Sequence, residues 1–320
     1  GMLGSHFADW VLENQPNYEV VGIDNLEGGY IENVDDRIDR YKIDVGSDLT
    51  RVFENRQVEY FFHFGCYSAE GLSPFMRRFN YSNNLVGTAN VVNFCIKNNV
   101  KLIYASSMSV YGNLQPPFKE TDTCKPIDPY GIAKYAGELD IKVAHDQHGL
   151  DYCIIRPHNI IGPRQNIWDK YRNVIGIWMR QILNDEPITI YGDGNQTRAF
   201  SWVMDYCPVF WKVAENDYGV NKIFNCGGDK HYTLNEVADL LLKVTGTNNK
   251  IIHLEPRHEV YDAYCNHDLV KSIMEYQEST SLEYMLREMW TWAYHQPKRP
   301  VKEWASFELE EGLYDFWKKR

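Results

Sequence analysis

The sequence predicts an α/β protein with a Rossmann-type, doubly wound parallel sheet and a smaller C-terminal α+β lobe. Strand-like and helix-like segments alternate through the first half of the chain, and this alternation requires crossover connections between parallel strands. Apolar residues in the long segment 81–98 recur at helical spacing, as at Leu85, Ala89 and Val92. After about residue 156 the alternation becomes irregular, which indicates a second lobe.

The expected elements follow in chain order. Helices are expected at 5–13, 81–98 and 129–148, and strands at 19–23, 41–43, 58–64, 101–105 and 152–155. Later helices are expected at 173–184 and 281–294. A third one is expected to begin at the capping box formed by Thr233 and Glu236 and to end at about residue 244. The charged and aromatic stretch 296–320 is expected to pack as a tail.

Composition excludes several classes of protein. The net charge of −11 argues against a nucleic-acid or anionic-membrane surface, and the longest apolar stretches are too short to span a bilayer. The seven cysteines are scattered, odd in number and without a CxxC pair, which favours reduced thiols in a cytoplasm over disulfides or zinc. No metal site and no export signal are expected.

The beginning of the chain resembles the second half of a dinucleotide-binding turn. Gly1 and Gly4 precede an amphipathic helix, and Asp24 ends a strand 20 residues later, where an acid can bind a ribose hydroxyl. Asn25 rather than Arg follows, which favours NAD over NADP. The first strand and first glycine of such a turn are missing from this sequence. We therefore expect a longer natural start, and poor NAD binding by the chain as given.

Tyr130 and Lys134 form the most informative pair of residues. Four residues apart in a helix, they share one face, where the ammonium lowers the pKa of the phenol. Ser107 follows the strand 101–105 at the sheet edge where ligands bind, so a phenol and a hydroxyl can meet one alcohol substrate. Three other pairs have the same spacing without this setting: Tyr218/Lys222, Tyr294/Lys298 and Tyr314/Lys318.

The ordered motifs resemble those of the extended short-chain dehydrogenases/reductases, in the nucleotide-sugar epimerase/dehydratase group and most like its UDP-glucose 4-epimerases. The matching segments are the glycine turn, Asp24, Asp44-Val45, His63-Phe64-Gly65-Cys66, Asn84, Ser107, Tyr130/Lys134 and Arg156-Pro157-His158-Asn159. The resemblance runs from Gly1 to about Leu309. It implies an NAD-binding domain at 1–164 with a returning segment at about 198–228, and a nucleotide-sugar lobe at about 165–197 and 229–320.

The resemblance also implies roles for individual residues. Tyr130 would be the acid/base, Lys134 would hold the nicotinamide ribose and lower the pKa of Tyr130, and Ser107 would bond the reacting hydroxyl. The cofactor set would be Gly1, Gly4, Asp24, Asn25, Asp44, Val45, Phe64, Gly65, Asn84, Tyr130, Lys134 and Pro157. Plainer interpretations stay open for two of these: Asp44 as a strand-end cap and Asn84 as a loop bridge. His63 is expected to be a packed core residue.

A second set of residues is implied for the UDP-sugar substrate: Ser107, Asn159, Asn173, Tyr191, Arg198, Arg257 and Tyr264. An aromatic such as Tyr191 can lie against a pyrimidine, and the two arginines can clamp a diphosphate. Core packing of Tyr191 and surface salt bridges of the arginines are the alternatives. The spacing between motifs in the family, counted from Arg257, places Tyr264 where its ring would leave no room for an N-acetyl group. Sugars of the uronic acid type stay an alternative, because Arg164 lies close enough in sequence to Asn159 to meet a carboxylate.

The reaction is inferred from two positions that lack an acid. In the family, dehydratases carry Asp-Glu at the positions of Met108 and Ser109, and decarboxylases carry Glu at the second; neither residue here can exchange a proton at neutral pH. A UDP-hexose 4-epimerase, which oxidises C4 and returns the hydride to the other face, needs no further acid. The alternatives are a UDP-glucuronate epimerase or decarboxylase, a dehydratase, or a catalytically silent nucleotide-binding protein.

The resemblance finally implies a homodimer. Family members usually pair through two long helices, here 81–98 and 129–148. Their expected outward residues are Phe79, Val91, Tyr135 and Leu139, although these residues could equally belong to the core.

Overall fold

A four-stranded parallel sheet forms the centre of the N-terminal lobe. The computed structural model describes residues 1–277 and 280–318. The central strands β4 and β5 are buried almost throughout, as expected for a parallel sheet covered on both faces. The strand order is β10-β5-β4-β3, with bounds β3 (Tyr60–His63), β4 (Lys101–Ala105), β5 (Tyr152–Pro157) and β10 (Lys222–Cys226).

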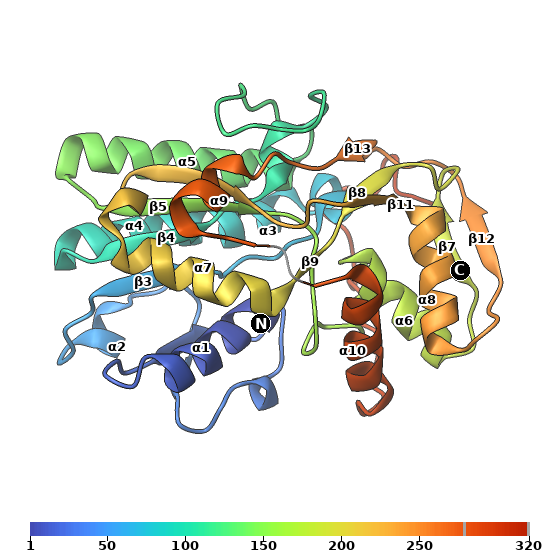
Figure 1. The fold of residues 1–320 in the computed structure, drawn as a ribbon, viewed down its shortest axis with the longest axis horizontal. Coiled ribbons are helices and arrows are strands. Elements are labelled where there is room, and N and C mark those ends of the chain that lie inside the picture. The colour runs from blue at the N-terminus through green and yellow to red at the C-terminus, as the bar shows by residue number, and fades with distance from the viewer. Residues whose placement is uncertain (278–279, 319–320) are drawn as a thin grey trace.

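Helices cover the two faces of this sheet (Figure 1). On one face α1 (Met2–Asn14) and α7 (Val203–Glu215) pack Phe7, Val11 and Phe210 against the apolar side chains of β4 and β5. On the other face lie α4 (Gly87–Asn98) and α5 (Pro129–His148). Asp128 caps α5 by accepting the Gly131 N–H at 2.9 Å, and Gly149 ends the helix in the left-handed conformation.

Strands β1 (Val21–Asp24) and β2 (Asp39–Lys42) form a separate parallel pair. Neither pairs with β3, and within residues 1–277 and 280–318 no strand lies between β1 and β3. Residues of β1 and β3 instead line the same cavity. The β1-β2 pair is therefore separate from the four-stranded sheet and faces it across the cavity.

The second lobe packs three helices around two small sheets (Figure 1). The sheets of this lobe are β7-β12 and β11-β8-β13, with bounds β7 (Ile188–Tyr191), β8 (Thr197–Ala199), β11 (His231–Thr233), β12 (Ile251–Leu254) and β13 (Asp262–Ala263). Its helices are α6 (Val174–Leu183), α8 (Leu234–Thr245) and α10 (Leu282–Tyr294). The capping box predicted at the start of α8 is present: Thr233 and Glu236 bond each other's backbone N–H. The remaining elements are α2 (Thr50–Phe53), α3 (Arg77–Tyr81), α9 (Asp268–Met274), β6 (Ile160–Ile161) and β9 (Ser201–Trp202), besides short turns of 3₁₀ or π helix.

Every predicted helix and strand is present, with bounds shifted by a few residues. The predicted helix 81–98 differs most. It begins earlier, at Arg77 in α3, and passes through a π-helical turn, η3 (Ser82–Val86), before α4 begins. The chain also returns to the first sheet through α7 and β10, which pairs with β5.

Of the four residues of the long helices that could face outward or belong to the core, one faces outward and three are covered by the fold. Val91 is fully buried, and Phe79 packs against Tyr67 and against Trp304 of the chain's own tail. Tyr135 packs against the cluster around Val110 and Phe118, and only Leu139 is as exposed as expected. The tertiary fold covers the other three, and Val86, Ile132 and Val143 are further exposed apolar side chains of this region beside Leu139.

The tail packs as predicted over its described residues. Trp304, Phe307, Leu313 and Trp317 contact a cluster formed by the segment 67–76. Tail residues Phe316 and Trp317 also reach the wall of the main cavity.

No described helix is long and apolar enough to cross a membrane. All seven cysteines are free thiols. Within residues 1–277 and 280–318, no group of three or more His, Cys, Asp or Glu side chains is arranged to hold a metal ion.

Candidate functional site

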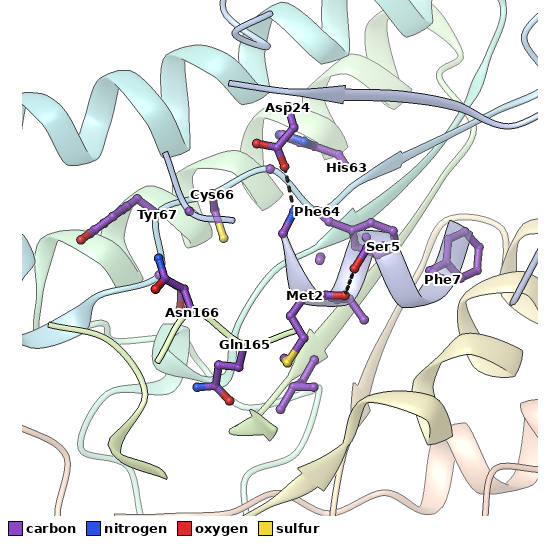
Figure 2. Close-up of a pocket in the computed structure, with 18 of the residues that line it drawn as sticks. Met2, Ser5, Phe7, Asp24, His63, Phe64, Cys66, Tyr67, Gln165 and Asn166 are labelled. Carbon is purple, nitrogen blue, oxygen red and sulfur yellow. Dashed lines mark hydrogen bonds and ion pairs between the residues drawn. The ribbon is translucent and has the colours of Figure 1, made fainter. Parts of the chain in front are cut away.

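A cavity of about 830 Å³ is lined by residues of both lobes. Three of its regions carry chemistry. The catalytic wall comprises residues 105–108 and Tyr130 of α5. The cofactor wall comprises the start of α1 with β1 and β2, and the substrate wall comprises β7 with Arg198, Arg257 and Glu259. Figure 2 shows part of the cavity, with Asp24 bonded to the residue that precedes α1, Gly1, and with Gln165 and Asn166 across the space.

The catalytic wall brings Ser107 and Tyr130 onto one surface. Ser107 follows β4 and caps the short turn η4 (Met108–Tyr111), while Tyr130 lies in the first turn of α5. Both line the cavity, and the Tyr130 hydroxyl accepts a hydrogen bond from Ser68 Oγ at 3.2 Å. The predicted convergence of these two residues is therefore present in the geometry.

Lys134 lies behind Tyr130 and is almost completely buried. Its Nζ donates to the carbonyl of Ala105 at 2.7 Å and lies 4.9 Å from the centre of the Tyr104 ring. Burial alone would lower the pKa of Lys134, but the neighbouring Cys66, Tyr104 and Tyr130 raise it above its ordinary value. The lysine is therefore charged and presents its charge to Tyr130.

The pKa of Tyr130 is nevertheless raised, contrary to the expectation of a phenolate. Burial is the largest cause and Cys66 adds to it, while Lys134 acts in the opposite direction without overcoming them. In this state Tyr130 is a neutral phenol. The sequence showed the helical spacing of the lysine but not how completely the fold would bury the tyrosine.

Glu70 is a site residue that the sequence interpretation missed. It begins the turn η2 (Glu70–Phe75), is exposed and lines the cavity beside the catalytic wall. Its carboxylate accepts a hydrogen bond from Ser109 Oγ, and Ser109 Oγ lies 3.0 Å from Ser107 Oγ. A carboxylate from another segment thus lies beside Met108 and Ser109, the two positions at which the local sequence has no acid. It comes from a distant segment, so no local motif could reveal it.

The cofactor wall centres on Asp24. One carboxylate oxygen accepts from the Gly1 ammonium at 2.8 Å, and the other accepts the Leu26 N–H at 2.6 Å. Asn25, Val45, Phe64, Gly65 and Pro157 also line the cavity. A Cβ built on Gly4 would meet Phe64 at an ordinary 3.6 Å, and one on Gly1 would meet nothing, so packing does not demand glycine at either place.

Three residues take the plainer roles that the sequence left open or expected. Asp44 caps a turn by accepting the Gly46 N–H at 2.7 Å, and it also accepts from Asn25. Asn84 is fully buried and bonds both backbone groups of Tyr67, so it holds the loop from which Ser68 reaches Tyr130. His63 is buried and bonded to Thr88, and burial lowers its pKa to about 3.

The substrate wall gathers Tyr191, Arg198 and Arg257 around Glu259. Arg257 lies over the Tyr191 ring at 4.6 Å, and both guanidinium groups pair with Glu259, at 3.0 and 3.1 Å. The Nε of Arg257 is buried without a hydrogen-bond partner. A bound anion would accept a hydrogen bond from this donor. Asn159 and Asn173 line the same cavity, and Asn173 also caps α6.

Two substrate predictions are corrected by the geometry. Tyr264 stacks on His231 at 4.1 Å between ring centres and is not among the described residues that line the cavity. An irregular loop lies between Arg257 and β13, so the spacing in sequence does not fix the position of Tyr264. Arg164 forms an ion pair with Asp9 of α1 at 2.7 Å, which occupies the group expected to meet a uronic acid.

The residues present fit a nicotinamide dinucleotide. A carboxylate at the carboxyl end of β1, the open first turn of α1 and the phenol of Tyr130 all face one cavity. A helix N-terminus favours phosphate, and a strand-end carboxylate favours ribose hydroxyls. In such a complex Asp24 would hold the adenosine ribose, and Tyr130 and Lys134 would hold the nicotinamide ribose.

Known proteins agree with this geometry. Residues 1–227 match the model of the NAD dependent epimerase/dehydratase family. A putative UDP-glucose 4-epimerase from Methanocaldococcus jannaschii is 32% identical over 274 residues, covering 82% of this chain and 86% of that protein. A UDP-N-acetyl-alpha-D-glucosaminuronate decarboxylase from Bacillus cytotoxicus is 30% identical, with 82% of each chain covered.

The fold of solved structures agrees as well. The crystal structure of UDP-glucose 4-epimerase from Thermotoga maritima with UDP-glucose superposes with a TM-score of 0.86 at 29% identity, covering 91% of this chain and 95% of that one. With more than two thirds of its length matched by the family model, the chain belongs to the NAD dependent epimerase/dehydratase family of enzymes.

Proposed function

We propose that this chain is a UDP-hexose 4-epimerase of the UDP-glucose/UDP-galactose type that uses NAD. The observation that carries the proposal is the meeting of Ser107 and Tyr130 on a cavity that Asp24 lines at one place and Arg257 at another. Such a cavity offers a place for a dinucleotide, a diphosphate and a reacting sugar hydroxyl. The similarity to the named 4-epimerases supports the same assignment.

The residues of the chain divide the work of the reaction. When bound, NAD supplies the acceptor and donor of the hydride. Tyr130 and Ser107 contact the oxygen on C4 of the sugar, with Tyr130 as acid/base, while the charge of Lys134 opposes the effect of burial on the phenol. When the substrate binds, Arg257 and Arg198 leave their shared partner Glu259 and pair with the diphosphate. Tyr191 then lies beside the pyrimidine ring of the nucleotide.

Incubation with UDP-glucose, followed by NMR of the anomeric protons, tests the proposal. Appearance of UDP-galactose in equilibrium with the starting sugar is the expected result. UDP-N-acetylglucosamine and UDP-glucuronate are tested in parallel, because the corrected place of Tyr264 removes the reason to exclude N-acetyl sugars. Failure to convert any of these with NAD present would reject the proposal.

A second candidate is a decarboxylase acting on a UDP-uronate. One observation favours it: the carboxylate of Glu70 lies against Ser109, the position where decarboxylases of the family carry a glutamate. The similar decarboxylase from Bacillus cytotoxicus agrees with it. Release of carbon dioxide from UDP-glucuronate, without formation of the 4-epimer, would favour this candidate over the first.

We also propose a homodimer formed through α4 and α5. The described surface of this region exposes Val86, Ile132, Leu139 and Val143, of which the last three lie on α5 at helical spacing. Light scattering at two concentrations tests the proposal. A Leu139→Glu, Val143→Glu variant is expected to be monomeric, and a monomeric wild type would reject the proposal.

A further inference from the structure

Glu70 lies at the end of a chain of side-chain hydroxyls that begins at Ser107. Its carboxylate accepts from Ser109 Oγ, whose oxygen lies 3.0 Å from Ser107 Oγ. Ser107 and Ser109 are both buried, whereas Glu70 is exposed and lines the cavity. Three oxygen-bearing groups from two distant segments therefore form one continuous line.

The direction of each hydrogen bond in this line follows from counting hydrogens. A hydroxyl has one hydrogen, and an ionised carboxylate has none to give. The hydrogen of Ser109 goes to Glu70, so Ser109 must accept in its contact with Ser107, and Ser107 must donate. The Ser107 oxygen also accepts the Ser109 backbone N–H at 3.2 Å.

Only one bonding site of Ser107 then remains for the cavity, and it is a lone pair. Whatever meets Ser107 there has to donate a hydrogen, as a sugar hydroxyl does. Tyr130 lines the same cavity, where its hydroxyl oxygen accepts from Ser68. The sugar hydroxyl therefore has two neighbours in the catalytic wall, and of these Ser107 can only accept from it.

We propose that Glu70 ends a proton relay, Ser107–Ser109–Glu70, that gives the hydroxyl proton of the substrate a second acceptor beside Tyr130. The proposal rests on the proposed function, since it needs a sugar alcohol that is oxidised. It applies equally if a decarboxylation follows that oxidation. Glu70 acts through the two serines and is therefore a positioning residue.

The relay balances the oxidation step. The C4–H bond breaks with its electron pair, which leaves as hydride to the oxidised nicotinamide dinucleotide. The O–H bond of the sugar breaks and its proton goes to Ser107, whose own proton moves to Ser109, and the proton of Ser109 moves to Glu70. A C4 ketone remains. The same moves in reverse return the proton when the hydride is added to the other face.

Glu70→Gln is the sharpest variant, because the amide keeps the shape of the carboxylate but cannot take up a proton. The amide oxygen can still accept from Ser109, so the hydrogen-bonded line is kept while the relay loses its final proton acceptor. We expect kcat to fall roughly 10- to 100-fold with little change in KM for UDP-glucose, in the range of a single acid–base group. Ser109→Ala cuts the same line and should lower kcat by a similar factor, and the double variant should be no worse than either.

Rescue by a conservative variant separates this role from a merely structural one. Glu70→Asp keeps a carboxylate and should recover part of the kcat that Glu70→Gln loses, with the KM for UDP-glucose unchanged. Tyr130→Phe should keep a residual rate that Tyr130→Phe, Glu70→Gln loses. The exposed Glu54, which directly follows α2, provides a matched control, because Glu54→Gln makes the same change of charge away from the relay.

A measurement without cofactor or substrate completes the test. A crystal structure of the protein without ligands should show a carboxylate oxygen of Glu70 within hydrogen-bond distance of Ser109 Oγ, and this contact should be absent in Ser109→Ala and kept in Glu54→Gln. A Glu70→Gln variant with the wild-type kcat would overturn the relay. If the wild type converts no nucleotide sugar, the proposed function fails, and the presence or absence of this contact still supports or overturns the hydrogen-bonded line.

Discussion

The catalytic wall and the cofactor wall of the cavity are held in different ways. Behind the catalytic wall, the buried Arg156 makes two bonds to the buried Glu138, at 2.9 and 2.6 Å, and Ser106 donates to the same carboxylate at 2.5 Å. The cofactor wall is a half-buried two-strand sheet joined to the first helix by the ion pair of Gly1 with Asp24. A sheet of two strands has little stability of its own.

This difference shows which part of the site is complete without a ligand. Buried, fully bonded polar groups fix one geometry, because any other arrangement leaves a charge unpaired at low dielectric. The cofactor wall has no such network and depends on what fills the cavity beside it. We therefore expect changes in the catalytic wall to alter turnover, and changes of ligand to alter the cofactor wall.

The largest expected effect is that of Tyr130→Phe, which leaves the catalytic wall packed but removes its reacting hydroxyl. Turnover should fall about 10²- to 10⁴-fold, the usual contribution of a general acid–base group, while binding of UDP is unchanged. Tyr218→Phe is the control, because Tyr218 has the same spacing to a lysine but lies exposed in a turn. A fully active Tyr130→Phe enzyme would contradict the assignment.

NAD should act chiefly on the cofactor wall. At a concentration 100 times its Kd, a ligand stabilises the folded state by about 2.7 kcal/mol. Hydrogen exchange with and without NAD should show strong protection of β1, β2 and the start of α1, and little change in β4 and α5. Equal protection of both walls would remove the contrast between them. No protection at any concentration would contradict the assignment of this wall to NAD.

Arg257→Ala tests the substrate wall, where binding rather than turnover should change. A hydrogen bond to a charged group contributes about 1.5–3 kcal/mol, so the Kd of UDP should rise roughly 10- to 100-fold, measured by calorimetry. Loss of the arginine also leaves Glu259 paired with Arg198 and bonded to Gln196. Arg287→Ala, which removes an exposed arginine paired with Glu283 on α10, should bind UDP like the wild type.

The sequence was sufficient where local pattern decides the structure. The helical spacing of Tyr130 and Lys134, the capping box at Thr233 and the strand that ends at Ala105 all depend on neighbours within a few residues. Of the four Tyr/Lys pairs, only Tyr130/Lys134 lies within one helix, as its setting predicted.

The sequence failed where distant segments meet. Glu70 reaches Ser109 across 39 positions, and Phe79 is covered by Trp304 of the tail rather than left outward. Tyr264 lies beyond a loop whose register no periodicity fixes. The degree of burial of Tyr130, which raises its pKa, is likewise a property of the whole fold. Such contacts carry no signature in either segment alone.

The smallest expected effect concerns Asp128, the cap of α5 behind the catalytic wall. Burial and the nearby charge of Glu70 raise its pKa to about 7, above the 3.8 of an ordinary aspartate. Below pH 4 the carboxyl is protonated whether the chain is folded or unfolded. Between about pH 4 and 7 the unfolded chain ionises it while the folded chain does not, so this group's contribution to stability falls as pH rises.

Asp128→Asn should remove that slope and keep the cap, because an asparagine oxygen accepts the Gly131 N–H equally well. The free energy of unfolding, measured by urea denaturation at pH 4 to 8, should favour the variant increasingly up to about pH 7, by on the order of 2 kcal/mol. The difference between the two proteins is the quantity to compare, since His63 and His158, with pKa values lowered to about 3, give both the opposite slope. If the difference in the free energy of unfolding between the two proteins did not change with pH, Asp128 would be ionised in the folded protein. Burial would then raise the pKa of this carboxyl less than expected.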